Sequence, residues 1–149
     1  MPDAIFFQPI GLIHSPFNVP EDTPIQPSRS QAAGQVEVYP EFSAGLQDIE
    51  GFSHIYLIYH FHRSAGCDLL VQPFLDDRKH GLFSTRYPRR PNQIGLSIVR
   101  LTARTDNILH IEGVDVLDGT PLLDIKPYFP DFDHQQNVRI GWYSQRSKE

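Results

Sequence analysis

Short apolar segments recur along the chain and predict an all-β fold. The clearest is residues 53–62 (SHIYLIYHFH), in which apolar side chains occupy both faces of an extended strand. Because both faces are largely apolar, we expect this strand to be buried on both sides. Further strands are predicted at residues 6–14, 35–39, 81–85, 95–103, 109–116 and 122–125.

Turn residues separate these segments and leave little room for long helices. The 13 prolines and 10 glycines are spread through the sequence rather than gathered in a linker. Only residues 40–49 are compatible with a short helical turn. The pair Asp118-Gly119 is typical of a hairpin turn, so we expect the strands on either side of it to pair. The pattern predicts a mainly all-β fold, a small β-barrel with short helical turns or a sandwich.

The length of 149 residues fits a single domain with its own core. We expect residues 131–149 to form a C-terminal strand or arm whose aromatic side chains dock on the barrel or on a second subunit. The one cysteine, Cys67, excludes an internal disulfide and is typical of a reducing compartment. Residues 1–17 lack a basic region followed by a long apolar run, so we expect a cytoplasmic protein without a signal peptide or membrane span.

Basic residues are concentrated in one part of an acidic chain. The net charge is −5, yet residues 76–104 carry seven basic side chains against two acidic ones, a local balance of +5. The rest of the chain therefore carries −10. Such a protein repels polyanions over most of its surface and accepts them at one place. The pattern favours selective contact with a structured RNA over indiscriminate nucleic-acid binding.

Residues 81–97 (GLFSTRYPRRPNQIGLS) are the strongest candidate for a binding loop. Pro88 and Pro91 exclude a helix, and the segment has more cations than a core strand carries. Its arginines are Arg86, Arg89 and Arg90. Because guanidinium groups suit phosphate and carboxylate, we expect a stiff loop that binds an anionic ligand. A solvated basic turn is the alternative interpretation.

Three histidines, His54, His60 and His62, lie on one face of the strand at residues 53–62. Zinc needs ligands that converge from different elements, and no acidic or cysteine side chain completes this set nearby. We therefore favour histidines that hydrogen-bond to neighbouring groups and expect no metal. Cys67 has no histidine nearby in sequence to act as its base, and no glycine-rich phosphate loop occurs.

A group of acidic residues precedes and enters residues 122–128. Asp115 and Asp118 either shape the turn or bind a ligand. Asp124, Lys126 and Tyr128 recur at every second position, so they can project to one side of a strand. A carboxylate, an ammonium and a phenol on one face form a candidate catalytic or substrate-orienting set. An exposed strand face is the alternative.

Several longer motifs resemble the TrmO family. They lie, in order, at residues 10–16 (IGLIHSP), 51–54 (GFSH), 61–62 (FH), 83–86 (FSTR), 90–97 (RPNQIGLS) and 118–128 (DGTPLLDIKPY). The likeness covers nearly the whole chain, to about residue 133. Members of this family are S-adenosylmethionine-dependent methyltransferases that methylate N6 of N6-threonylcarbamoyladenosine beside the tRNA anticodon.

The resemblance implies a small β-barrel methyltransferase that forms a homodimer and binds S-adenosyl-L-methionine and tRNA. This agrees with the β-rich pattern and with the lack of a dinucleotide-binding fingerprint. Longer members have an additional C-terminal domain that we do not expect in this chain. Two alternatives stay open: a non-catalytic RNA- or anion-binding barrel, and a methyltransferase of the same fold that acts on another modified nucleoside.

The resemblance also implies which residues contact the cofactor. They are Pro24, Ile25, Gln26, His62, Arg63, Arg86, Asn92, Ile94, Leu96, Asp115, Val116, Leu117 and Asp118. Two motifs depart from the family pattern. Ile25 replaces the usual arginine, so a backbone group or Arg29 would make that contact. Gln93 replaces the second proline of the family's Arg-Pro-Asn-Pro-Ile-Gly motif, which leaves the loop less rigid.

In the implied reaction a nitrogen attacks the sulfonium methyl in line, and orientation is the protein's main contribution. The candidate catalytic residues are Asp124, Lys126 and Tyr128, with Asp124, Tyr128 or His54 as base and Lys126 as stabiliser. The candidate substrate residues are Arg89, Arg90 and Arg100. One of Arg86, Arg89 and Arg90 would pair with the threonyl carboxylate, and Arg78, Lys79, Arg100 and Arg104 would meet tRNA phosphates.

Overall fold

The computed structural model describes residues 3–23, 31–73 and 76–145. The chain divides into two compact units. The first comprises Met1–Arg63 and Ile94–Tyr128, and the second comprises Ser64–Gln93 and Phe129–Glu149. That residues 1–149 form a single domain stays a prediction.

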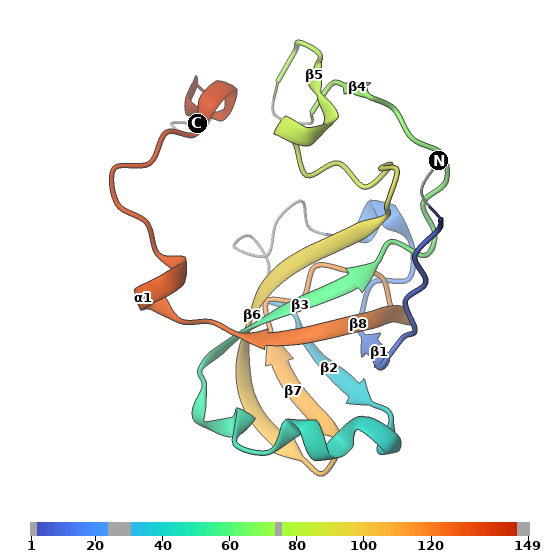
Figure 1. Cartoon of the computed structure of the whole chain (residues 1–149), viewed down its shortest axis with the longest axis vertical. Coiled ribbons are helices and arrows are strands. Elements are labelled where there is room, and N and C mark those ends of the chain that lie inside the picture. Colours follow the sequence, from blue (N-terminus) through green and yellow to red (C-terminus); the bar gives the residue numbers. More distant parts are fainter. Residues whose placement is uncertain (1–2, 24–30, 74–75, 146–149) are drawn as a thin grey trace. The chain divides into compact units, whose positions relative to one another are not determined.

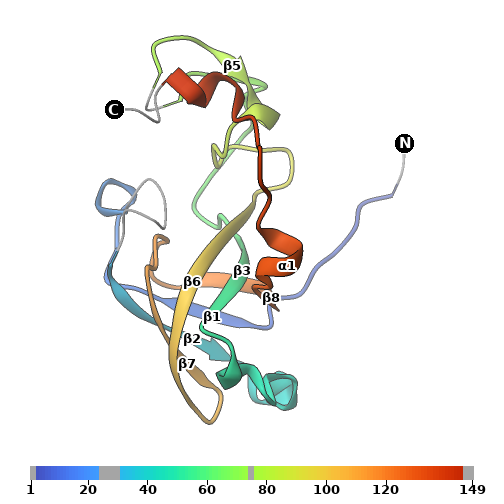
Figure 2. The ribbon, with the colours of Figure 1, turned by 90° about the vertical axis from the view of Figure 1, so that its left-hand side faces the viewer.

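A closed barrel of six strands forms the first unit. Its strands are β1 (Gly11–His14), β2 (Ala33–Val38), β3 (His54–His60), β6 (Ile94–Thr105), β7 (Ile108–Glu112) and β8 (Thr120–Pro127). They follow the order β1-β2-β7-β6-β3-β8, and all neighbours are antiparallel. Closure leaves no unpaired sheet edge among these strands. The predicted all-β barrel is confirmed (Figures 1 and 2).

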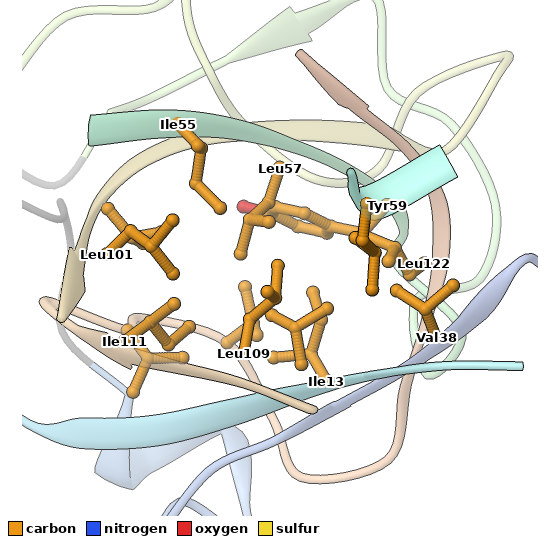
Figure 3. Packing of buried hydrophobic residues seen from close by; sticks show 14 residues of the cluster. Ile13, Val38, Ile55, Leu57, Tyr59, Leu101, Leu109, Ile111 and Leu122 are labelled. Atoms are coloured by element: carbon orange, nitrogen blue, oxygen red, sulfur yellow. The ribbon is translucent and has the colours of Figure 1, made fainter. Parts of the chain in front are cut away.

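Alternate side chains of the barrel strands point inward and form the core. In β6, every second residue from Gly95 to Leu101 is buried, and the residues between them are exposed. Inward side chains from every strand of the barrel face one another, and Figure 3 shows among them Ile13, Leu57 and Leu109. Burying an aliphatic side chain contributes about 1.5–3 kcal/mol, so this cluster is the main source of barrel stability.

β3 is fully buried on one side only. Ile55, Leu57 and Tyr59 are at most 3% exposed. On the outer side, Tyr56 and Ile58 are half-buried and His54 is exposed. The predicted burial of both faces is therefore wrong, because a barrel strand turns its outer side chains away from the single core.

A glycine at position 95 allows the Tyr59 ring to cross β6. The two residues lie opposite each other on β3 and β6. A Cβ added at Gly95 would lie 2.2 Å from Tyr59 Cε2 and 2.8 Å from Phe61 Cζ. These two rings pack edge to face, with centroids 5.5 Å apart. The missing side chain thus makes room for the aromatic pair that fills this end of the barrel.

Three predicted strands are shorter than expected, and the one predicted at residues 109–116 ends at Glu112 in β7. β1 is confined to Gly11–His14, and Phe6 and Phe7 before it are 91% and 69% exposed. Residues 81–85 contribute only Gly81 to β5 (His80–Gly81) and continue as a 3-10 turn, η5 (Leu82–Ser84). The strand predicted there is wrong, because only Leu82 of this segment finds a buried position.

The hairpin predicted around Asp118-Gly119 is also wrong. A tight turn is present: Gly119 has a φ of 82°, and the Thr120 N–H donates to Leu117 O at 3.3 Å. However, β7 pairs with β2 and β6, whereas β8 pairs with β1 and β3. Since both sides of β7 are already occupied, residues 113–119 instead carry the chain across one end of the barrel.

Short 3-10 segments connect the strands, and the helical turn predicted at residues 40–49 is confirmed. The segments of the first unit are η1 (Pro20–Asp22), η3 (Pro40–Leu46) and η4 (Ile49–Gly51). Leu46 is buried, and Phe42 and Ile49 pack against the barrel core. Among the described residues, no helix has the length and apolarity to cross a membrane.

The second unit contains two short strands and the C-terminal arm. β4 (Leu70–Val71) pairs with β5, and the arm contains α1 (Pro130–Asp133) and η6 (Gly141–Gln145). Trp142 stacks on His80 with ring centroids 4.5 Å apart, and its Nε1–H donates to Ser84 O at 2.9 Å. His80 Nε2 lies 2.5 Å from Asp76 Oδ2. The arm is therefore anchored through Trp142 within this unit.

Gly95→Ala should destabilise the fold, because the added methyl group would overlap the Tyr59 ring. Overpacking of this kind costs about 1–3 kcal/mol, which urea unfolding followed by circular dichroism will measure. Gly45→Ala is the matched control, since no atom lies within 4 Å of the added Cβ there. Equal losses of stability in the two variants would contradict the packing role of Gly95.

Candidate functional site

One rim of the barrel gathers several of the predicted cofactor residues. β3 ends where β6 begins, with His60 opposite Ile94. β8 starts beside the same end of β3, with Leu122 opposite Tyr59. The loop between β7 and β8 therefore meets the end of β3 and the start of β6. The polar rim, as we call this site, consists of residues 61–63, 94–96 and 113–119.

Buried valines and hydrogen bonds hold the loop of residues 113–119 in place. Val114 and Val116 are buried. The Ser15 hydroxyl donates to Val116 O at 2.5 Å, and the Ser15 N–H donates to Asp118 Oδ1 at 3.0 Å. The loop is thereby tied to the end of β1, and the Asp118 carboxylate has a defined orientation.

One buried hydroxyl group contacts the second carboxylate of the loop, and a second hydroxyl group contacts the first. Ser97 Oγ donates to Asp115 Oδ1 at 2.8 Å, and the Tyr59 hydroxyl lies 2.7 Å from Ser97 Oγ. Ser97 and Tyr59 are 2% and 3% exposed. The sequence identified Asp115 as a candidate but neither Ser97 nor Tyr59. The one available signal was a serine at an inward position of an otherwise apolar strand face.

His62 and Arg63 extend the polar rim beyond the end of β3. Burial lowers the pKa of His62 from its ordinary value, the charges of His60 and Arg63 lower it further, and a hydrogen bond with the His60 backbone partly offsets these effects. These effects favour the neutral imidazole, which can accept a hydrogen bond on one ring nitrogen. Arg63 Nη1 donates to Asn18 O at 3.1 Å, which fastens the segment after β1 to the rim.

The other predicted cofactor residues are spread more widely. Ile94 and Leu96 point outward from β6, Val116 points into the core, and Leu117 is half-buried. Arg86 and Asn92 are exposed residues of the second unit. Pro24, Ile25 and Gln26 lie outside the described residues, as does Arg29. The polar rim therefore brings together some of the predicted cofactor residues: His62, Arg63, Ile94, Leu96 and residues 115–118.

The predicted catalytic side chains share the outer face of the barrel. Asp124 and Lys126 lie opposite the outward residues Ile58 and Tyr56 of β3, and Lys126 Nζ is 3.4 Å from Asp124 Oδ2. The Tyr128 ring packs against Tyr56, with centroids 5.9 Å apart. The sequence correctly predicted that these three side chains project to one side.

This row of side chains leads away from the polar rim. The Tyr128 N–H donates to His54 O at 3.2 Å, at the opposite end of β3 from His60. The two ends are six residue steps apart, which corresponds to about 20 Å at about 3.3 Å per residue. Tyr128 and His54 therefore lie far from the rim of their own barrel.

The histidines of β3 do not converge. His54 Nδ1 lies 2.8 Å from Ser53 Oγ, at the end of β3 that is remote from His60 and His62. Within residues 3–23, 31–73 and 76–145, no three metal-ligating side chains come together. The described part of the chain therefore offers no site at which these histidines could share a metal ion.

In the second unit, the predicted substrate residues Arg89 and Arg90 have protein partners. Arg89 Nε lies 3.5 Å from Asp68 Oδ2. Arg90 Nη1 donates to Thr85 O at 3.0 Å and to Tyr87 O at 2.9 Å, which fixes its guanidinium 5.9 Å from the centroid of the Phe83 ring. Because a guanidinium has five N–H donors, each arginine retains donors for an anion.

Two further arginines belong to the barrel. Arg100 Nη1 lies 3.8 Å from Glu112 Oε2, and its side chain is 64% exposed. Arg104 is more engaged, since it donates to Leu46 O, Glu50 Oε2 and Asp106 O at 2.8–3.2 Å. Arg100 can still reach a phosphate, whereas the contacts of Arg104 favour a structural role in holding the 3-10 segments.

A cavity of about 300 Å³ lies away from the polar rim. Apolar side chains of η3 and β8 dominate its lining, including Phe42, Leu46 and Ile125, and Asp124 also contributes. None of the predicted cofactor residues that the structure describes lines it. The cavity and the polar rim are therefore alternative binding places on the same barrel.

A closed antiparallel barrel with ordered carboxylates at one rim is a different class of protein from the doubly wound folds that bind nucleotides at parallel strand ends. The chain belongs to the TrmO family, since the family model for the tRNA-methyltransferase O N-terminal domain matches residues 12–134. The family resemblance found in the sequence motifs is confirmed.

Named relatives and solved structures agree with this assignment. The chain is 62% identical over 143 residues to a probable S-adenosyl-L-methionine-binding protein of Pyrococcus abyssi, covering 95% of this chain and 78% of that protein. It is 37% identical over 141 residues to the mouse tRNA (adenine(37)-N6)-methyltransferase, covering 89% and 33%. A crystal structure of TrmO superimposes with a TM-score of 0.80 at 39% identity, covering 93% and 64%. The chain thus spans a third of the mouse enzyme and about two thirds of the solved TrmO chain.

Proposed function

We propose that this chain is an S-adenosylmethionine-dependent tRNA methyltransferase of the cytoplasm. The observation that carries the proposal is the polar rim, where fixed carboxylates and His62 lie together. Family membership supports it, because relatives are named as S-adenosyl-L-methionine-binding proteins and tRNA methyltransferases. We further propose that the methyl group goes to N6 of threonylcarbamoyladenosine beside the anticodon.

The side chains of the polar rim suit an adenosine-containing cofactor. Asp115 and Asp118 are held by protein donors on Oδ1, so their carboxylates are oriented before any ligand arrives. Carboxylates accept hydrogen bonds from ribose hydroxyls and from an adenine amino group. S-adenosylmethionine, when bound, supplies a methyl group on a sulfonium. The roles of Pro24, Ile25, Gln26, Arg86 and Asn92 in holding it stay predictions.

The remaining task of the protein is to activate and place the target nitrogen. Its lone pair is delocalised between adenine and a urea carbonyl, so a base that takes its proton would restore nucleophilicity. Asp124, Tyr128 and His54 are the proposed candidates, and Lys126 would stabilise the resulting charge. Well-aligned reactants gain up to roughly 7–11 kcal/mol from orientation, so the position of these groups relative to the cofactor decides the rate.

The distance between the polar rim and Tyr128 favours a twofold dimer. Within one barrel about 20 Å separate Tyr128 from the end of β3, which is too far for one substrate atom to contact both. A twofold axis running across the strands would set the start of β3 in one copy beside its end in the other. That arrangement can bring Tyr128 to the polar rim of the second copy.

The outer face of β3 and β6 offers an apolar surface for this dimer. Ile94, Leu96 and Ile98 of β6 are 40%, 50% and 39% exposed and follow one another on one side of the strand. Tyr56 and Ile58 lie opposite Ile98 and Leu96 on the neighbouring strand. A contiguous apolar stripe of this kind is typical of a protein interface.

The second unit provides features that suit a single-stranded RNA loop. Residues 64–93 carry five basic and three acidic side chains in a chain whose net charge is −5. Phe83 is 76% exposed, with the fixed Arg90 beside its ring. Exposed aromatic rings stack on unpaired bases, and arginines contact the phosphates or the threonyl carboxylate. We therefore propose that the anticodon loop contacts Phe83, Arg89 and Arg90.

The purified chain should convert threonylcarbamoyladenosine in tRNA to its methylated form when S-adenosylmethionine is present. Mass spectrometry of the digested nucleosides reports both turnover and substrate, and tRNA without the modification is the control. Methylation of a different nucleoside would replace the proposed substrate. If the chain bound tRNA but gave no heat with S-adenosylmethionine in calorimetry, it would be a non-catalytic RNA-binding barrel.

Replacing Arg89 and Arg90 together by alanine should lower tRNA methylation at least about tenfold, because two charge-assisted contacts to RNA are lost. Calorimetry should show nearly unchanged affinity for S-adenosylmethionine. Arg139→Ala removes one exposed arginine of the C-terminal arm and should leave both quantities unchanged. An equal loss of cofactor affinity and methylation in the double variant would contradict the proposal that these arginines bind the RNA substrate.

Ile98→Glu should convert the proposed dimer to monomers, because it places a carboxylate in the centre of the apolar stripe. Sedimentation velocity will measure the change, and circular dichroism will establish that the barrel remains folded. Val138→Glu is the control, since Val138 is also exposed, at 60%, but lies outside the stripe. A wild-type chain that sediments as a monomer at micromolar concentration would refute the dimer.

A further inference from the structure

We propose that Ser97 and Tyr59 are positioning residues that hold the Asp115 carboxylate ready for a hydroxyl or amino donor of the cofactor's adenosine group. This inference rests on the proposed function of the polar rim and names two residues to which the family resemblance assigns no role. Neither side chain is accessible enough to touch a ligand, since they are 2% and 3% exposed. Their effect on cofactor binding is therefore indirect, and the hydrogen bonds lead from them to Asp115.

The direction of the hydrogen bonds follows from the number of protons available. A serine hydroxyl has one proton, and Ser97 donates it to Asp115 Oδ1 at 2.8 Å. The Tyr59 hydroxyl, 2.7 Å from Ser97 Oγ, must then be the donor of the second bond. Both protons point toward Asp115, and each bond polarises the next. The pair therefore favours the ionised carboxylate and restricts its rotation.

The location of Ser97 argues that its hydroxyl serves this carboxylate. It occupies an inward position of β6, opposite Leu57, and Val99 follows on the same side of the strand. A polar group in an apolar core costs free energy unless it is hydrogen-bonded. Both hydrogen bonds found for the Ser97 hydroxyl belong to the series that runs from Tyr59 through Ser97 to Asp115. An alanine would fill the core position without any need for partners.

The motif around residues 94–97 can now be explained one residue at a time. Gly95 makes room for the Tyr59 ring, which brings its hydroxyl to Ser97. Ser97 connects that hydroxyl to Asp115, while Ile94 and Leu96 point outward. One short segment of β6 thus links the barrel core, the polar rim and the outer face.

The test compares Ser97→Ala and Tyr59→Phe with the unchanged chain, using calorimetry with S-adenosylmethionine. Ser97→Ala should weaken binding about tenfold, because a hydrogen bond to a charged group is lost. Tyr59→Phe keeps the ring and should weaken binding less, by roughly threefold. Ser43→Ala is the control, since that hydroxyl donates to Pro40 O on an exposed segment. It should bind as the wild type does.

A double-variant cycle separates positioning from general stability. In the Asp115→Asn background, adding Ser97→Ala should cause no further loss of affinity, because the carboxylate that Ser97 positions is already gone. An additive loss would overturn the proposal. So would unchanged affinity in Ser97→Ala alone.

Carbon-detected NMR of the Asp115 carboxyl group gives a readout that does not depend on the cofactor. In Ser97→Ala the carboxyl should protonate at a higher pH than in the wild type, because the ionised form has lost a donor. An unchanged titration would refute the role of Ser97. If this titration moves but no form of the chain binds S-adenosylmethionine, the proposed function fails while the hydrogen-bonded chain to Asp115 stands.

Discussion

The Tyr59 ring packs directly against the backbone of β6, and this contact governs both the core packing and the hydrogen bonds at one end of the barrel. It is possible only because residue 95 has no side chain. The ring fills the end of the core with Phe61 and places its hydroxyl beside Ser97. Core packing and the hydrogen bonds at the rim therefore both depend on the position of the Tyr59 ring. A change at the rim also changes the core beneath it.

The barrel separates the two sets of residues that we propose for cofactor binding and for catalysis. Oriented carboxylates and His62 lie at the polar rim, whereas Asp124, Lys126 and Tyr128 follow one another along the outer face toward the opposite end of β3. Within one barrel, Tyr128 lies about 20 Å from the rim, which is too far for one substrate atom to contact both. The exposed apolar stripe on β6 gives a physical reason for a second copy to complete the arrangement.

Much of the fold could be predicted from the sequence because alternation has a direct structural meaning. The strand predicted at residues 95–103 is present as β6, with alternate residues buried and exposed, whereas β3 is apolar on both faces in sequence but fully buried on one side only. The prediction of a hairpin at Asp118-Gly119 was wrong because a turn sequence determines local geometry but not which strands pair afterwards. The strand prediction for residues 81–85 was wrong because a few apolar residues in a loop have the same sequence pattern as a short strand.

The candidate site was less predictable for a related reason. The carboxylates of Asp115 and Asp118 could be selected by type, but Ser97 and Tyr59 reach Asp115 only through the barrel, 18 or more positions away along the chain. The partners of Arg90 are backbone carbonyls, which no side-chain pattern reveals. Contacts that form only when the barrel closes, or that use backbone groups, cannot be predicted from the local sequence pattern.

NMR mapping will show whether the cofactor binds at the polar rim. Titration of the isotopically labelled chain with S-adenosylhomocysteine should shift backbone amide resonances of residues 61–63, 94–96 and 113–119. Resonances of Phe42, Leu46 and Ile125, which line the separate cavity, should stay unchanged. Shifts confined to residues of that cavity, with the polar rim unaffected, would contradict cofactor binding at the polar rim.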